Sequence, residues 1–152
     1  MTDSARSLPP VAWVVAPVAL GTIPAGIYFA LTGGGAAPGA GALPLPDWAV
    51  VLVWIGIYGG MGRAAWWANR DLAQPNRAAP LALLTAGAVQ SWLFWVSPSL
   101  AAIALTDAAG VVLSAVTFLA FRETLPQASL CLLPWVIWMP LTLAFKLVAL
   151  AG

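Results

Sequence analysis

The sequence has very little charge, no histidine and a single cysteine. Only 7% of its residues are Asp, Glu, Lys or Arg and 62% are hydrophobic, whereas soluble globular domains carry roughly 25% charged residues. One cysteine, Cys131, excludes a disulfide within the chain, and without histidine the usual metal clusters cannot form. A net charge of +1 offers no basic stripe for nucleic-acid phosphates. The composition is that of an integral membrane protein.

Reactive side chains are also too few for ordinary enzyme chemistry. Acid/base and nucleophilic catalysis need cooperating groups, and Asp107 is the only carboxylate well inside a long apolar run. We therefore expect no catalytic residues, no metal site and no required cofactor. The sequence predicts a protein that is not an enzyme.

Five apolar runs, each long enough to cross a hydrocarbon core, account for most of the 152 residues. A signal peptide is the alternative interpretation of the first run, although that run is longer than a typical signal-peptide core. The longest connection, 33–46, is rich in glycine and proline. The sequence predicts an all-α, five-transmembrane-helix bundle forming one domain over residues 1–152, with spans at about 11–31, 48–68, 80–96, 100–121 and 128–150.

Positive charge falls on one side of this predicted bundle. With five spans, the N-terminus and the turns after the second and fourth spans share a face, and these segments carry Arg6, Arg70, Arg77 and Arg122. The loops of the opposite face contain no lysine or arginine. By the positive-inside rule the N-terminus is expected to be cytoplasmic, with the chain in a bacterial inner membrane.

Polar and aromatic side chains from three spans fall at one predicted depth. At 1.5 Å per residue, Trp54, Gln90 and Asp107 each lie about 9 to 10 Å from the outer ends of their helices. The last span adds further tryptophans on one face, and the 33–46 loop lies above this level. We predict an outer pocket, roofed by that loop, whose ligand-binding residues are Trp54, Tyr58, Gln90, Trp92, Asp107, Trp135, Trp138 and Phe145.

Each of these features also has a plain structural interpretation. The tryptophans inside the spans could pack between helices, and Asp107 could hydrogen-bond a neighbouring helix, although intramembrane carboxylates usually face a cavity or a partner. Lys146, near the end of the last span, is expected to extend its ammonium group outward. Gly56 and Gly60 form a GxxxG pattern, which allows close helix packing within the bundle or across a dimer.

Two motifs carry a family resemblance over residues 44–150. The segment 46–62 contains P-D-W, W-I-G-I-Y and M-G, and the segment 134–138 reads P-W-V-I-W. They resemble the P-x-W, W-x-x-x-Y and M-G run and the P-Y-L-x-W of the TspO/MBR family (tryptophan-rich sensory protein, translocator protein, peripheral-type benzodiazepine receptor). The sequence departs from that pattern in its first loop, which lacks the family's K-P-x-W, and at Lys146, where the family carries an asparagine.

The resemblance implies a compact five-helix bundle, often a homodimer, whose pocket binds tetrapyrroles such as protoporphyrin IX or a haem-like ligand, and in some members sterols. It would place Trp54, Tyr58, Gln90, Trp135 and Trp138 in that pocket. We expect a non-enzymatic membrane protein that binds or translocates porphyrin-like or other apolar ligands, with membrane lipids, a hydrophobic small molecule and a homodimer or larger complex as partners. Two alternatives stay open: an accessory subunit of a larger pigment–protein complex, and light-dependent porphyrin degradation.

Overall fold

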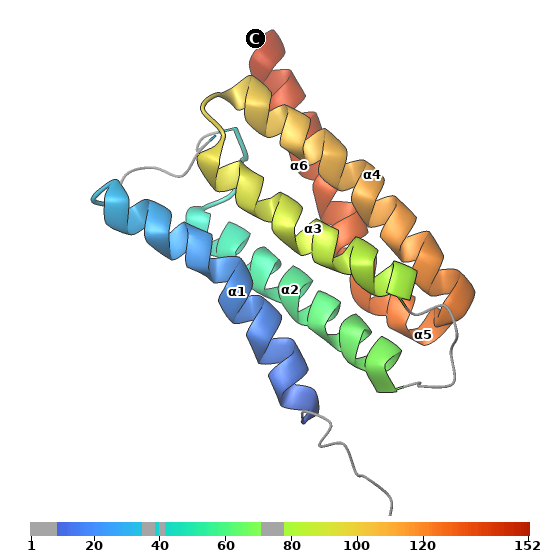
Figure 1. Cartoon of the computed structure of the whole chain (residues 1–152). Helices are drawn as coiled ribbons and strands as arrows, with labels where there is room; N and C mark the ends of the chain where they lie inside the picture. The colour runs from blue at the N-terminus through green and yellow to red at the C-terminus, as the bar shows by residue number, and fades with distance from the viewer. Residues whose placement is uncertain (1–8, 35–38, 40–41, 71–77) are drawn as a thin grey trace, which may run out of the picture.

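The computed structural model describes residues 9–34, 39, 42–70 and 78–152 (Figure 1). No strand occurs among these residues, and five helical stretches are long and apolar enough to cross a membrane. The predicted five-helix all-α fold is therefore confirmed. The elements are α1 (Pro10–Leu31), α2 (Asp47–Arg70), α3 (Ala78–Val96), α4 (Leu100–Thr124), α5 (Pro126–Ser129), the 3-10 helix η1 (Leu130–Leu132) and α6 (Leu133–Ala151).

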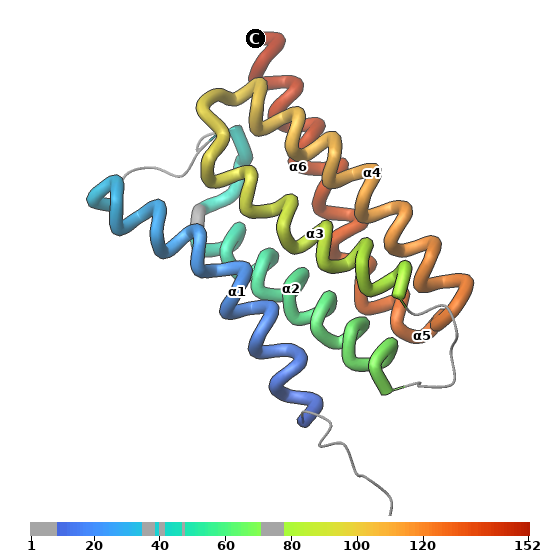
Figure 2. The backbone as a smooth tube through the Cα atoms, viewed as in Figure 1, coloured from blue at the N-terminus to red at the C-terminus, as the bar shows by residue number. Residues whose placement is uncertain are grey.

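The long helices run up and down and enclose one core (Figures 1 and 2). Helix α1 packs against α2 and α3, and α3 packs against α4. Helix α4 in turn packs against α6, and α6 together with η1 contacts α2. The beginning of α1 and the end of α6 consequently lie at opposite ends of the bundle (Figure 1). Because the helices pack against one another in a closed ring, a side chain that points inward from any helix contacts residues of at least two other helices.

The last span changes helix type near its start. α5 is followed by the 3-10 turn η1 and then by α6, in which Pro134 occupies the first turn and Pro140 lies inside. Because proline has no backbone N–H, Pro134 cannot donate to the carbonyl one turn before it, and the tighter turn falls just ahead of it. Pro126–Ala151 is nevertheless one stretch long and apolar enough to cross a membrane, and both prolines lie within it.

Prolines and small polar residues also shape the other helices. Pro17 and Pro24 lie inside α1, where the hydroxyl of Thr22 donates to the carbonyls of Val18 and Ala19, each at 3.0 Å. The side chain of Ser99 caps α4 by accepting from the backbone N–H of residue 102 at 3.2 Å. The Thr22 hydroxyl is thus satisfied by backbone carbonyls and the Ser99 hydroxyl by a backbone N–H, which suits an environment without water.

Glycines allow α2 to approach its neighbours closely. A Cβ at Gly60 would overlap the carbonyl oxygen of Cys131 in η1, and one at Gly62 would overlap the carbonyl of Trp13 in α1. Gly56, by contrast, is exposed and a Cβ there would meet nothing within 4 Å. Of the GxxxG pair, only Gly60 packs within the chain.

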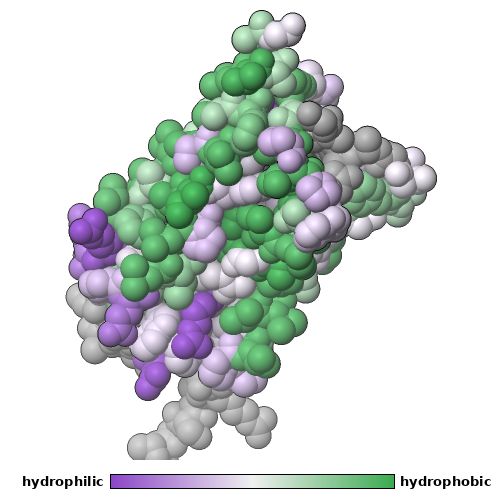
Figure 3. All heavy atoms as spheres, turned by 180° about the vertical axis from the view of Figure 1, so that it is seen from behind, coloured by the Kyte–Doolittle hydropathy of each residue, from purple (hydrophilic) through white to green (hydrophobic). Residues whose placement is uncertain are grey.

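The two ends of the bundle differ in polarity. Seen from behind, hydrophilic residues gather at the lower end, and most of the face above it is hydrophobic (Figure 3). Arg70 ends α2 and Arg122 lies in the last turn of α4 at this same end, and both are exposed. Arg6 and Arg77 lie outside the described residues.

Candidate functional site

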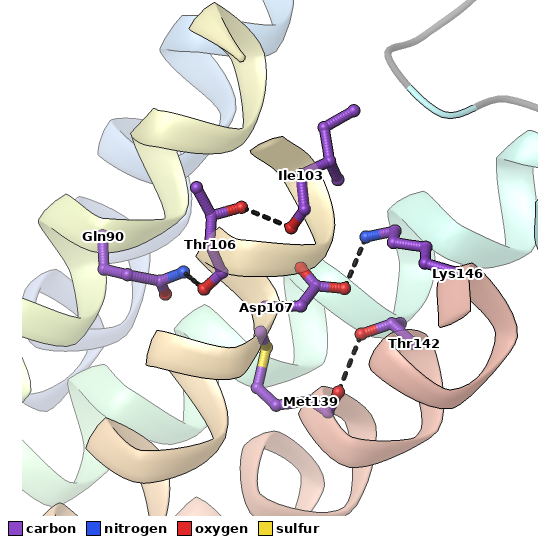
Figure 4. A network of polar contacts seen from close by, with 7 residues as sticks. All are labelled: Gln90, Ile103, Thr106, Asp107, Met139, Thr142 and Lys146. Carbon is purple, nitrogen blue, oxygen red and sulfur yellow. Dashed lines mark hydrogen bonds and ion pairs between the residues drawn. The ribbon is translucent and has the colours of Figure 1, made fainter. Parts of the chain in front are cut away.

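A buried ion pair joins α4 to α6 (Figure 4). Lys146 Nζ donates to Asp107 Oδ2 at 2.5 Å, and the two side chains are only 3% and 6% exposed. The expectation that Lys146 extends outward is therefore wrong. Lys146 follows Trp138 and Thr142 at four-residue spacing, and all three are buried, so its position on the helix directs it into the bundle.

Further groups surround the ammonium of Lys146. Its Nζ lies 4.9 Å from the ring centroid of Phe94 in α3, a cation–π arrangement. Gly39 also lies close to this pair, since a Cβ there would be 3.5 Å from the Cδ1 of Ile103 and 4.0 Å from the Cε of Lys146. Three helices and one loop residue thus shield the ion pair from the end of the bundle.

Gln90 forms the second polar contact at this level. Its Nε2 donates to the backbone carbonyl of Thr106 at 2.5 Å, which links α3 to α4 (Figure 4). Within the described part of the chain, the Oε1 of Gln90 and the Nε1 of Trp138 are buried and have no hydrogen-bond partner. An unpaired acceptor and an unpaired donor are costly in an apolar interior, so both are groups that a ligand or a water would satisfy.

Two large residues of α6 fill the core. Trp135 is 1% exposed, and its ring covers Gly87 of α3 so closely that a Cβ there would overlap it. Met139, also 1% exposed, lies in the same way against Gly110 of α4. Trp135 thus serves as a packing residue in this structure, the plain alternative that its sequence left open.

Two cavities lie along α1. The smaller has a volume of about 120 Å³ and is lined by aromatic residues of α2 and α3, including Trp54, Tyr58 and Phe94. The Trp54 and Tyr58 rings lie 5.5 Å apart with an interplanar angle of 30°. The larger cavity, about 360 Å³, is lined by α1, α2 and α3 and includes Trp92.

Tyr58 borders the smaller cavity near the point where the two cavities meet, and we call its ring the partition. Its ring lies against Gly21, the one residue that borders both cavities, and a Cβ on Gly21 would overlap it. The Ser91 hydroxyl donates to the carbonyl of Ala88 at 2.6 Å, so the Tyr58 hydroxyl is the donor in its 2.7 Å bond to Ser91 Oγ. One hydrogen bond between α2 and α3 therefore holds the partition in place.

The sequence of α2 to α6 also resembles that of a known protein family. Residues 40–149 match the model of the TspO/MBR family, which is more than half of the chain. The chain belongs to the TspO/MBR family. Searches of curated proteins and of solved structures gave no match. The family consists of membrane proteins of the binding and translocator type, and the matched region contains α2 to α6.

In this TspO/MBR protein the eight predicted ligand-binding residues do not share one hollow. Trp54 and Tyr58 border the smaller cavity and Trp92 the larger. Five others border neither of these cavities: Gln90, Asp107, Trp135, Trp138 and Phe145. The depth estimate grouped residues at the same level that in fact lie on different sides of the bundle.

Sequence reasoning missed two contributors to these sites. It assigned no role to α1, although Gly21, Thr22 and Ala25 form one wall of the smaller cavity. It also missed Lys146 as the partner of Asp107. The signal for the second was present in the sequence, since Lys146 repeats the helical spacing of inward-facing residues; for the first, no motif in α1 pointed to a cavity.

Proposed function

We propose that this TspO/MBR protein binds a flat apolar ligand of the tetrapyrrole class, such as protoporphyrin IX, without transforming it chemically. The aromatic cavity beside α1 is the observation that carries the proposal. Trp54 and Tyr58 present tilted aromatic faces there, with Phe94 and Trp95 on the facing helix. Aromatic faces stack on planar conjugated rings, and a mainly apolar cavity with few polar groups is the usual form of a small-molecule site.

The volumes of the two cavities along α1 indicate how much of them the ligand would occupy. Sites for small molecules have volumes of roughly 300 to 1,000 Å³, so the cavity of about 120 Å³ is too small alone and the cavity of about 360 Å³ is at the lower limit. A macrocycle would need both compartments. We propose that Tyr58 swings away from Ser91 and Gly21 when the ligand enters, which joins them.

The other predicted residues have different roles in this proposal. Trp92 contacts the ligand from the larger compartment. Gln90 and Trp138 retain buried unpaired polar atoms but border neither compartment, so the proposed ligand position does not use them. Asp107 is already paired with Lys146, so it supports the bundle instead of accepting a hydrogen bond from the ligand.

Titration with protoporphyrin IX tests the proposal directly. Quenching of tryptophan fluorescence in the purified full-length protein should saturate, and Trp54→Ala should raise the Kd by about tenfold because one stacking face is lost. Trp48→Ala is the matched control, since Trp48 lies in the same helix, is 68% exposed and borders none of the described cavities. Equal loss in both variants would contradict the assigned site.

The same sample distinguishes the alternatives. Loss of porphyrin absorbance on illumination, dependent on the protein, would establish light-dependent degradation. Absence of saturable quenching, together with co-purification in a larger complex under mild detergent, would support an accessory subunit. We also propose a bacterial inner membrane with a cytoplasmic N-terminus, which the exposed Arg70 and Arg122 at one end of the bundle support.

A further inference from the structure

Two arginines and two tryptophans gather in the last two turns of α2. The guanidinium carbon of Arg63 lies 4.6 Å from the ring centroid of Trp66 and 5.8 Å from that of Trp67. The guanidinium carbon of Arg70 lies 5.4 and 5.7 Å from the same two centroids. The indoles themselves contact edge to face at 5.0 Å. We call these four residues the Arg–Trp cluster.

Both guanidinium groups lie within 6 Å of the centroids of the same two indole rings, although like charges repel. They come from opposite directions, one from a turn before Trp66 and one from a turn after it, and converge on the same rings. Arg63 and Arg70 are both exposed, and the only ion pair among the described residues is the distant Asp107–Lys146 pair. Indole faces attract the guanidinium cations, but they cannot accept the paired N–H hydrogen bonds that a guanidinium group can donate. Within the described part of the chain, no carboxylate is paired with the cluster.

The cluster lies at an edge of the predicted membrane span, with both arginines exposed and both indoles half-buried. The span ends at Arg70, and tryptophans at such an end mark the level of lipid headgroups. Ala64 and Ala68, on the other side of the same turns, are fully buried. Ile55 and Leu52, which lie beyond the middle of the span toward its other end, are exposed and apolar. A polar group at the edge is thus followed by apolar surface suited to an acyl chain.

We propose that the Arg–Trp cluster binds the headgroup phosphate of an anionic phospholipid. Guanidinium groups match phosphate oxygens in paired hydrogen bonds, so two of them can share one phosphate. Trp66 packs beside the glycerol region, and an acyl chain follows the apolar face of α2. Trp67 and Arg70 also border a hollow against Thr124–Ala128 of the α4–α5 turn, which leaves room for the headgroup.

Native mass spectrometry of the full-length protein in detergent can measure this binding with phosphatidylglycerol and phosphatidylcholine added separately. The wild type should retain the anionic lipid preferentially. Arg63→Gln and Arg70→Gln should each weaken phosphatidylglycerol binding by about fivefold, as expected for one cation near a lipid surface, with little change for phosphatidylcholine. The matched control is Arg122→Gln, which removes an exposed arginine at the same end of the bundle but outside the cluster.

The outcomes separate a lipid site from a general field effect. Equal weakening by Arg122→Gln would show that net charge alone attracts the lipid and would overturn the proposal, as would an unchanged preference in Arg63→Gln/Arg70→Gln. Displacement of the lipid by millimolar inorganic phosphate would identify a simple anion site instead. If the double glutamine variant fails to fold, Arg63→Lys/Arg70→Lys decides: it keeps both charges but loses paired hydrogen bonding, and should retain only part of the preference.

Discussion

Removing one partner of the buried ion pair between α4 and α6 should destabilise the protein strongly. Lys146→Met keeps an unbranched side chain of similar length but leaves the Asp107 carboxylate, on a side chain only 6% exposed, without its cation. Stranding one charge of a buried pair typically costs about 3 to 5 kcal/mol in free energy of unfolding. The variant also loses the contact between the ammonium and the Phe94 ring. We expect a loss in this range.

Removing both charges should cost much less than removing one. In the double variant Asp107→Leu/Lys146→Met no charge remains in the apolar interior, and apolar replacement of buried pairs is often neutral or stabilising. The double variant should therefore be more stable than Lys146→Met. A double-mutant cycle that adds Asp107→Leu alone, measured by SDS-induced unfolding followed by circular dichroism, gives the coupling energy directly.

One result would refute this reasoning. If the effects of the two single substitutions add up in the double variant, the two groups do not interact, and the pair contributes nothing through its charge. Glu123→Gln provides the control for loss of a carboxylate as such, because Glu123 is exposed near the end of α4 and should give no measurable change.

Two further predictions concern the core and the cavity partition. Gly87→Ala should lower the free energy of unfolding by about 1 to 3 kcal/mol, because the new methyl group would overlap the Trp135 ring. Gly56→Ala, where nothing lies within 4 Å of the new methyl group, should instead stabilise α2 by about 0.5 to 1 kcal/mol. Equal effects of the two substitutions in the same unfolding assay would contradict the assigned packing. Tyr58→Phe should lower the free energy of unfolding by about 0.5 to 1.5 kcal/mol, since only the hydrogen bond from the Tyr58 hydroxyl to Ser91 is lost. A thermal melt indistinguishable from that of the wild type would show that this hydrogen bond does not hold the partition.

The fold could be predicted because membrane burial constrains a sequence severely. Five runs of sufficient length and apolarity permit few other arrangements in lipid, where backbone polar groups must be paired within the helices. The predicted bounds nevertheless miss the ends: α2 continues to Arg70 and α4 to Thr124, beyond the last predicted apolar residues. Helices extend through polar residues into the interface, so apolarity alone underestimates their length.

The site could be predicted only in part, since depth along a helix says nothing about rotation around it. Trp54 and Gln90 share a level, yet Trp54 faces α1 and Gln90 reaches Thr106 of α4. Lys146 illustrates the same limit. Its nearness to the helix end suggested an outward position, but its spacing from Thr142 placed it on the buried face, and the carboxylate of Asp107 offered a partner there.

The bundle is held together unevenly, and this bears on where a ligand can enter. In α6 five residues are buried, and the ion pair fixes that helix to α4, so separating these two helices would expose charge to lipid. In α1 only Gly21 is buried, and two prolines lie inside the helix. Both cavities are lined by residues of this helix. The end of α1 also diverges from its neighbours (Figure 2). Separating α1 from its neighbours would therefore break no ion pair among the described residues, and Tyr58, held by its hydrogen bond to Ser91, lies near the point where the two cavities meet.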